Sequence, residues 1–341
     1  MATTNTTTPK ATLASVAEIA GVSIPTVSKV LNGRDDVAAA TRDRVLEVMR
    51  SLNYRSPAPR RRTDSIMIDV VVESVTTAYY TEVMDGILEC TSENRAEVVL
   101  SAMSLEAVSA AERVRRMLDA GRQGLLLVTS KWGRSDILTF QERGIPVVLV
   151  DPLNPPGADV VSVGATNWAG GKAATEHLLD LGHERIAHLG GPVRAECSQD
   201  RQHGYMAALS GRGIEARPEY VISRDFTRTF GIQGLAQLLE LPEPPTAIFA
   251  ANDTIAIGVW EEARRRGMTL PADLSIVGFD GTSFAEQTMP QLTTIEQPLR
   301  EIGRAAARTL LRQIDGQQPD STRIELATRL LVRESTAPPR G

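Results

Sequence analysis

The sequence predicts an all-α N-terminal headpiece followed by a two-lobed α/β body. Two short helices with apolar stripes are expected between Thr12 and Asn32. From Ser65 onward, short β-branched runs alternate with helical stretches in two successive series. Residues 1–64 carry ten Lys/Arg against six Asp/Glu, whereas the whole chain has a net charge of −5. A basic head on an acidic body is typical of a nucleic-acid-binding module joined to a different domain.

The composition is that of a globular cytoplasmic protein, with 42% hydrophobic and 23% charged residues and no apolar run of membrane-spanning length. Residues 1–10 are polar and Thr-rich without the apolar core of a secretory signal, so we expect a disordered tail. Cys90 and Cys197 lie far apart and outside any Cys-x-x-Cys pair, which indicates neither a disulfide framework nor a zinc site. No cofactor, metal or membrane contact is expected.

Residues 11–56 are predicted to form a helix-turn-helix headpiece. Gly21 ends the first helix with the positive φ that a tight turn needs, and Ser23 caps the second. Pro25 lies in the first turn of that second helix, where its missing N–H costs little, and it points outward together with Lys29. The second helix of such a motif enters a DNA major groove. From spacing alone, an ordinary helical hairpin in a small core is the alternative.

A third helix over residues 38–52 and a basic linker over residues 57–64 complete the N-terminal region. The two prolines in the linker oppose a continuous helix. Arg60, Arg61 and Arg62 either lie along phosphates or in a narrow minor groove, or they form a solvated tether. The sequence favours neither interpretation over the other.

The run from Val16 to Asn32, Val-Ala-x-x-Ala-Gly-Val-Ser-x-x-Thr-Val-Ser-x-Val-Leu-Asn, resembles the headpiece of lactose-repressor-type (LacI/GalR) transcription factors. The resemblance implies two sets of DNA contacts, of which the backbone contacts position the module and the base contacts specify sequence. The implied backbone set is Ser23, Thr26, Ser28, Asn32, Thr41 and Tyr54, and the implied base-reading set is Ile24, Pro25 and Lys29. Many relatives insert a Leu from a hinge helix into the minor groove, but this linker is shorter and contains no Leu.

The body is predicted to contain two parallel sheets covered by helices on both faces, because its strand patterns are apolar throughout. The expected strands of the first series are residues 66–72, 98–102, 125–128, 147–150 and 160–163. Those of the second are 186–189, 247–250 and 274–277, with 324–332 near the end. The expected helices are 81–93, 107–120, 171–181, 201–209, 230–239 and 254–266. Ligands of such folds bind at the carboxyl ends of the strands.

Polar side chains suited to a polyhydroxylated ligand follow several of these strands. Asp151 and Asp280 each come directly after a strand, and their carboxylates accept hydrogen bonds from paired hydroxyls. Arg201 follows the turn after another strand and donates in a fixed fork. Tyr79 and Trp168 are placed where an aromatic ring stacks on a sugar, although core packing is the alternative for any single aromatic residue.

The resemblance to LacI/GalR regulators also covers the body, through the run from Gly171 to Ile186, the motifs Ala-Asn-Asp253 and Val-Gly-Phe-Asp280, and the segment 290–295. It implies a type I periplasmic-binding-protein-like ligand domain over residues 65–335, with residues 336–341 as a C-terminal tail. The implied first lobe takes about residues 65–163 and 295–319, and the second about 164–293 and 320–335. The implied effector contacts are Asp151, Arg201, Phe226, Asn252 and Asp280.

The sequence does not favour the alternative hypothesis that the body is an α/β enzyme. No Walker A loop, dinucleotide-binding glycine motif or nucleophile elbow is present, and the spacing of His177, His183 and His188 suits no single helix face. A freestanding exported sugar-binding protein is also disfavoured, because such a protein needs no helix-turn-helix headpiece. The sequence therefore predicts a homodimeric DNA-binding regulator, most simply a repressor, that binds a pseudo-palindromic operator and a sugar or short oligosaccharide. A purine or phosphorylated metabolite stays open as the alternative effector, and the direction of control is not determined.

Overall fold

The computed structural model describes residues 13–31, 37–52, 65–103, 108–154, 157 and 159–340, and the chain divides into two compact units, Met1–Asp64 and Ser65–Gly341. The first unit contains three helices in its described part, α1 (Leu13–Ala20), α2 (Ile24–Leu31) and α3 (Ala39–Ser51). Gly21 has the expected positive φ of 63° between α1 and α2. The amide of Thr26 donates to the Ser23 hydroxyl, which confirms the predicted cap.

The three helices enclose a small core of their own. Its fully buried centre is formed by Val16, Val27 and Val45, one from each helix, and Ala20 and Met49 lie beside them. The apolar residues repeat at helical spacing on each helix, so one face of each turns inward. The unit therefore has the packing of a three-helix domain rather than of a loose helical arm.

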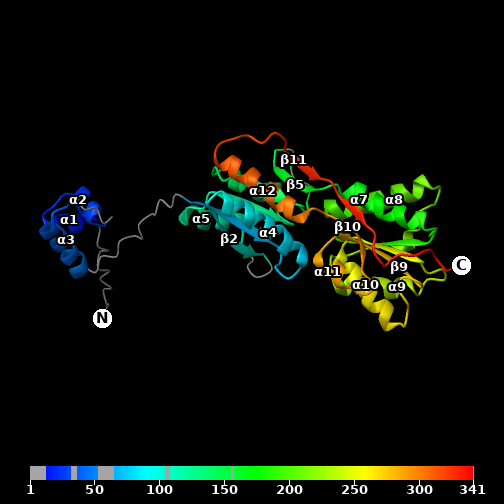
Figure 1. Cartoon of the computed structure of the whole chain (residues 1–341). Helices are drawn as coiled ribbons and strands as arrows, with labels where there is room; N and C mark the ends of the chain where they lie inside the picture. The colour runs from blue at the N-terminus through cyan, green and yellow to red at the C-terminus, as the bar shows by residue number, and fades with distance from the viewer. Residues whose placement is uncertain are drawn as a thin grey trace, which may run out of the picture. The chain divides into compact units, whose positions relative to one another are not determined.

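The second unit consists of two six-stranded sheets with helices on both faces of each (Figure 1). The first sheet has the order β11-β5-β4-β3-β1-β2 and the second has the order β12-β10-β9-β8-β6-β7. The strands are β1 (Ile66–Val72), β2 (Ala96–Ala102), β3 (Gly124–Val128), β4 (Val147–Val150), β5 (Val161–Ala165), β6 (Ile186–Gly190), β7 (Val221–Ser223), β8 (Ala247–Ala250), β9 (Ser275–Asp280), β10 (Thr293–Glu296), β11 (Arg323–Leu326) and β12 (Arg329–Leu331). All pairings are parallel except that of β10 with β12.

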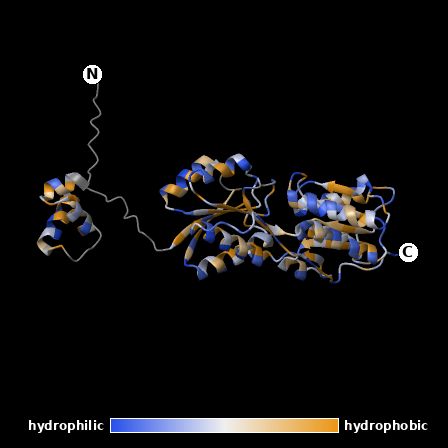
Figure 2. Ribbon diagram, turned by 90° about the horizontal axis from the view of Figure 1, so that it is seen from above, coloured by the Kyte–Doolittle hydropathy of each residue, from blue (hydrophilic) through white to orange (hydrophobic). Residues whose placement is uncertain are grey.

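Helices cover both sheets. They are α4 (Ala78–Glu93), α5 (Ala110–Asp119), α6 (Arg134–Gln141), α7 (Asn167–Asp180), α8 (Glu196–Gly211), α9 (Arg228–Leu238), α10 (Asp253–Arg265), α11 (Ser283–Gln287) and α12 (Leu299–Ile314), with a 3₁₀ turn at Pro218–Tyr220. In the first sheet, even positions of β1 such as Ile68 and Val70 pack under α4 and α12, whereas Val71 packs under α5 and α6. In the second sheet, one core lies under α9 and α10 and the other under α7 and α8. Hydrophobic residues accordingly line the strands of both lobes (Figure 2).

The chain crosses between the lobes three times: from β5 to α7, from β10 to α12, and from β11 to β12. Two of these crossovers are joined side by side. The hydroxyls of Thr166 and Thr328 lie 3.0 Å apart, and the amide of Thr328 donates to Thr166 Oγ1. The amide of Thr166 donates to the carbonyl of Leu326. This pair of crossovers is the natural hinge of the body.

The topology corrects three of the predicted boundaries. The sequence places residues 320–335 wholly in the second lobe, but β11 pairs with β5 in the first sheet, and only β12 belongs to the second sheet. The expected single strand 324–332 is therefore two strands, separated by a crossover at residues 327–328. Ile295 belongs to β10 and hence to the second lobe.

The predicted C-terminal tail is part of the second lobe. The hydroxyl of Ser275 donates to the carbonyl of Ala337, whose amide donates back to the same hydroxyl. His177 Nε2 lies 2.9 Å from the hydroxyl of Thr336, and Arg340 pairs with Asp273. These contacts extend the second lobe beyond residue 335.

Candidate functional site

The headpiece presents part of its predicted DNA-binding set on α2. Ile24, Pro25 and Lys29 are exposed, and Ile24 is 49% exposed although it is apolar. Ser23 and Thr26 share a hydroxyl–hydroxyl hydrogen bond of 2.8 Å at the start of the helix. The amides of the first turn, which favour anions, are therefore next to two hydroxyls.

The structure describes fewer details of the other predicted DNA-binding residues. Thr41 is half-buried near the start of α3. Ser28 lies within α2, but its side chain is outside the described residues. Asn32, Tyr54, Arg60, Arg61 and Arg62 are outside the described residues altogether.

In the body, Asp151 and Tyr79 come together at the carboxyl end of the first sheet. Asp151 follows β4 with a positive φ of 41° and is 5% exposed. The phenol of Tyr79, in the first turn of α4, donates to Asp151 Oδ2 at 2.6 Å. Burial raises the pKa of Asp151, which the hydrogen bond from Tyr79 and the charge of Arg201 partly offset. A non-glycine residue in this backbone region is strained, and such strain is concentrated at functional sites.

Arg201 is the buried cation of the second lobe. Its Nε donates to Asn167 Oδ1 at 2.8 Å, and its Nη1 donates to the carbonyl of Ala251 at 2.6 Å. The guanidinium carbon lies 3.8 Å from the centre of the Phe279 ring. Asn167, in the first turn of α7, was not among the predicted site residues. No motif marked it, because its role depends on the packing of α7 against α8.

Asp280 ends β9 in a strained conformation with a φ of 103°. Its Oδ1 lies 3.5 Å from Arg201 Nη1 and accepts a hydrogen bond of 2.7 Å from Gln297 Nε2. Burial, with a smaller contribution from the nearby carboxylate of Asp253, raises the pKa of Asp280 to about 8, although the charge of Arg201 opposes this rise. Gln297 is a second residue that sequence reasoning missed. It is 3% exposed, and within the described part of the chain its Oε1 has no hydrogen-bond partner.

The remaining predicted effector contacts are Asn252, Phe226 and Trp168, and they differ in their contacts with the cluster around Arg201. Asn252 is buried at the start of α10, where its Oδ1 accepts from the amide of Ile255 at 2.8 Å. The ring of Phe226 lies against Gly191 and 6.0 Å from the guanidinium carbon of Arg201. Trp168 is 46% exposed, and no hydrogen bond or ring contact described for it joins it to the cluster. Six of the seven predicted residues therefore gather at the facing ends of the two sheets, whereas Trp168, the second residue of α7, is exposed.

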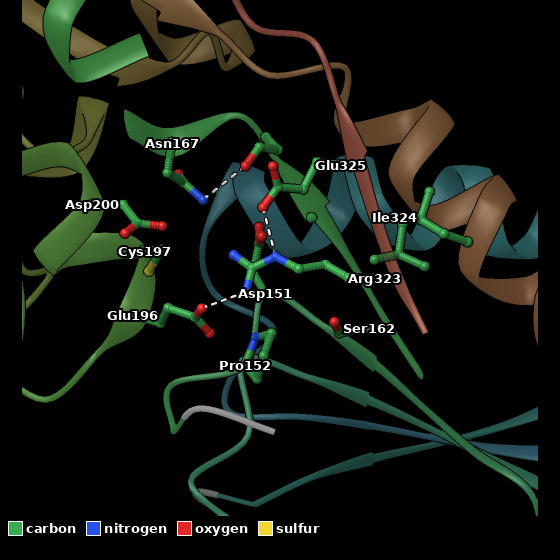
Figure 3. Close-up of a pocket in the computed structure, with 13 residues that line it drawn as sticks. Asp151, Pro152, Ser162, Asn167, Glu196, Cys197, Asp200, Arg323, Ile324 and Glu325 are labelled. Carbon is green, nitrogen blue, oxygen red and sulfur yellow. Dashed lines mark hydrogen bonds and ion pairs between the residues drawn. The ribbon is translucent and has the colours of Figure 1, made fainter. Parts of the chain in front are cut away.

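A small cavity of about 30 Å³ lies beside Asp151 and is lined from both lobes (Figure 3). Its walls include Asn167 of α7, three residues of α8, namely Glu196, Cys197 and Asp200, and Arg323 and Glu325 of β11. None of these was predicted, because α8 and β11 are more than 100 residues apart and only the fold brings them together. Burial raises the pKa of Cys197 to about 12, so its thiol is protonated and unreactive.

Metal binding finds no support in the part of the chain that the structure describes, where no three His, Cys, Asp or Glu side chains gather as a metal site. Of the three histidines that lie close together in the sequence, two are held by contacts within the second lobe. His183 bonds to Thr246 and Ser275, and His188 is stacked between Tyr205 and Phe249. Among the described residues, no helix is long and apolar enough to cross a membrane.

A helix-turn-helix unit and a two-lobed α/β body with a polar cluster between its sheets define a ligand-responsive DNA-binding regulator. The chain matches the family model "Bacterial regulatory proteins, lacI family" over residues 12–56 and the model "Periplasmic binding protein-like domain" over residues 175–336. It is 34% identical to the HTH-type transcriptional repressor CytR of Escherichia coli (strain K12), over 96% of each chain.

Two solved structures extend the comparison over nearly the whole chain. The transcriptional regulator CelR–cellobiose complex is 33% identical, with a TM-score of 0.72 over 95% of this chain and 99% of that one. The lac repressor dimer bound to operator and the anti-inducer ONPF is 28% identical, with a TM-score of 0.70 over 96% of this chain and 100% of that one. The chain belongs to the lacI family of bacterial regulatory proteins, whose members are DNA-binding regulators rather than enzymes.

Proposed function

We propose that this protein is a cytoplasmic repressor of carbohydrate-utilisation genes, controlled by a sugar or short oligosaccharide that binds between the two lobes. The observation that supports this most directly is the convergence of Asp151, Arg201 and Asp280. They come from different strands and helices, yet they meet at the facing carboxyl ends of the two sheets. The carboxylate of Asp151, the carboxyl group of Asp280 and the guanidinium of Arg201 offer hydrogen-bond acceptors and donors that match the paired hydroxyls of a sugar.

The solved relative with a bound sugar, CelR with cellobiose, supports the same ligand class. In the present arrangement the cavity of about 30 Å³ is far smaller than the roughly 300 Å³ of a small-molecule site. Sugar binding therefore requires the lobes to separate further around the crossovers at Thr166 and Thr328. A ligand that favours one lobe angle shifts DNA affinity through that preference.

The charge of the cleft disfavours the alternative of a phosphorylated effector. Two guanidinium groups, those of Arg201 and Arg323, face a larger number of carboxylates. The carboxylates are those of Asp151, Glu196, Asp200 and Glu325. A phosphate dianion in this cleft meets like charges at low dielectric, whereas a neutral sugar does not.

A homodimer is part of the proposal, because a single α2 helix offers few base contacts. Two headpieces related by a twofold axis would bind a pseudo-palindromic operator. The related lac repressor was solved as a dimer bound to operator. For the DNA-binding set, Ile24, Pro25 and Lys29 are proposed as the base-reading residues, and the predicted phosphate contacts keep the roles that the family resemblance implies.

A thermal-shift panel of cellobiose, ribose, galactose and adenosine tests the effector class, since a bound ligand raises the melting temperature by mass action. Calorimetry of the best sugar with Phe226→Leu and Asp280→Asn then tests the site. We expect at least a tenfold loss of affinity in each variant, because a polar ligand is left with an unpaired group or an unsupported ring face. Phe284→Leu, at an exposed aromatic residue of α11, is the matched control.

Two outcomes would contradict different parts of the proposal. Near wild-type sugar affinity in both variants would show that the pocket is misplaced. Stabilisation by adenosine alone would keep the pocket and change the ligand class. Arg201→Ala is not a suitable test, because Arg201 is 3% exposed and supports Asn167 and Phe279, so its removal destabilises the lobe as well.

A further inference from the structure

Arg323 lies on the edge strand of the first sheet with its side chain on the face away from the core. In β11, Ile324 and Leu326 pack on the core of the first lobe, while Arg323 and Glu325 are exposed. Arg323 Nε donates to Glu325 Oε1 at 2.7 Å. This contact between alternate residues of one strand holds the guanidinium in a fixed orientation.

The other end of the guanidinium reaches the second lobe. Arg323 Nη1 donates to Glu196 Oε1 at 2.6 Å, and Glu196 is the first residue of α8 (Figure 3). The two residues are 127 positions apart in the sequence. Five residues further along α8 lies Arg201, the buried cation of the proposed effector site. The ion pair thus connects the edge of one sheet to the helix that carries the central ligand contact of the other lobe.

The pair also borders the cavity between the lobes. Arg323, Glu325 and Glu196 form part of the wall of the cavity beside Asp151. Glu196 is 23% exposed and Arg323 is 53% exposed at the side chain, so separation of the lobes would hydrate both groups rather than leave either charge buried alone. A second interlobe contact lies between other elements, where the amide of Ser283 donates to Glu82 of α4 at 3.0 Å.

We propose that Arg323 and Glu196 form an interlobe brace that stabilises the closed arrangement of the two lobes. Both partners belong to elements that move with different lobes, so opening about the crossovers must break the pair. Glu325 pre-orders the guanidinium and lowers the entropy lost when the pair forms. Loss of the brace shifts the equilibrium toward the open arrangement without removing any group of the proposed sugar-binding cluster.

The experiment measures the distance between the lobes in the full-length protein. Spin labels are placed at Asp119→Cys in the first lobe and Glu240→Cys in the second, both at exposed positions. The native Cys90 and Cys197 are buried and are not expected to react with the label. Pulsed dipolar spectroscopy then gives the distribution of interlobe distances without any sugar, so the result does not depend on the proposed effector.

We expect Arg323→Gln to raise the ratio of open to closed molecules by up to about fivefold, the range that exposed ion pairs support. Glu196→Gln should give the same shift, and the double variant should add nothing further, because either single change already removes the pair. High salt should move the wild-type distribution toward that of Arg323→Gln and leave the variant unchanged.

The matched control is Arg329→Gln. Arg329 is an exposed arginine paired with Glu296, and both residues lie in the sheet of the second lobe. Its distance distribution should remain that of the wild type. Equal distributions for Arg323→Gln and Arg329→Gln, or independent additive shifts from Arg323→Gln and Glu196→Gln, would overturn the brace. Failure of sugar binding in the thermal-shift panel would contradict the proposed effector and leave this result standing.

Discussion

Asp280 shows at the residue scale how a buried carboxyl makes folding depend on pH. Burial raises the pKa of Asp280 from 3.8 to about 8 in the folded protein. The folded state therefore holds a proton that the unfolded state has lost between about pH 4 and pH 8, and stability falls as pH rises through that window. His188 has the opposite effect, because burial lowers its pKa from 6.5 to about 4. Its contribution makes stability rise with pH, and that contribution is confined to pH values below 6.5.

Between pH 6.5 and pH 8 the Asp280 effect is thus isolated from that of His188. In the wild type we expect the free energy of unfolding to fall with pH in this window by at most about 1.4 kcal/mol per pH unit. In Asp280→Asn this contribution to the fall should be absent. Urea unfolding of wild type and variant at several pH values in this window measures the difference. Parallel pH dependences of the two proteins would contradict a protonated Asp280.

Lys29 is the long donor on the outward face of α2, and it tests whether that helix reads bases. Lys29→Ala should weaken operator binding by about 1–3 kcal/mol and leave binding to random DNA nearly unchanged. Arg44→Ala, at an exposed position of α3, is the control and should weaken both kinds of DNA equally. A salt-matched titration on operator and random duplexes compares them. Equal losses for Lys29→Ala on both duplexes would make Lys29 a phosphate contact.

The sequence predicted those site residues that carry a local signal. Asp151 and Asp280 stand directly after apolar strand runs, and both occupy strained backbone positions at the facing sheet ends. Gln297, Glu196 and Arg323 carry no such signal, because a crossover, a helix start and an edge strand acquire their roles only when the lobes are assembled.

At the element scale, the packing of α7 on α8 depends on a glycine. A Cβ on Gly204 would lie 2.2 Å from the carbonyl oxygen of Trp168 and 2.6 Å from the amide of Lys172. These are backbone atoms of α7 that cannot move independently of their helix. The two helices thus approach closely where Asn167 must meet Arg201, and the glycine serves the geometry of the site.

Gly204→Ala should lower the free energy of unfolding by about 1–3 kcal/mol through overpacking. Gly211→Ala is the matched control in the same helix, because a Cβ there meets nothing within 4 Å. It should raise stability by about 0.5–1 kcal/mol, since alanine loses less entropy in a helix. Chemical denaturation of the two variants gives opposite signs if the contact is the cause. A loss in Gly211→Ala as large as in Gly204→Ala would instead indicate a general effect on the helix.

Strands were predicted well where both faces are buried. The predicted 66–72, 147–150 and 247–250 coincide with β1, β4 and β8. The error at 324–332 has a physical reason, because the apolar alternation of β11 continues through the crossover into β12 although the two strands join different sheets. Short β7 and β10 were missed, since three or four residues give too little pattern.

At the scale of the whole molecule, the two units differ in charge and each has its own hydrophobic core. The body is rich in carboxylates and its cleft is acidic, whereas the net positive charge lies in residues 1–64. An acidic body repels DNA, so binding must be confined to the headpieces and the linker. The linker arginines Arg60, Arg61 and Arg62 lie outside the described residues. Their role is therefore tested through the effect of their charge on DNA affinity.

Replacement of Arg60, Arg61 and Arg62 by Ala should lower affinity for all DNA. It should also flatten the dependence of log K on log salt concentration by up to about three units, because each neutralised phosphate contributes close to one. Fluorescence anisotropy over a salt series gives the slope for operator and random duplexes.

The control for this linker variant replaces three exposed body arginines, Arg143, Arg194 and Arg308, with Ala. It changes the net charge by the same amount and should leave the slope unchanged if long-range charge is screened. Equal slopes in the linker variant and the wild type would make the linker a solvated tether. Specificity would then depend on α2 alone, and the twofold arrangement of the headpieces would have to supply all of the discrimination between operator and random DNA.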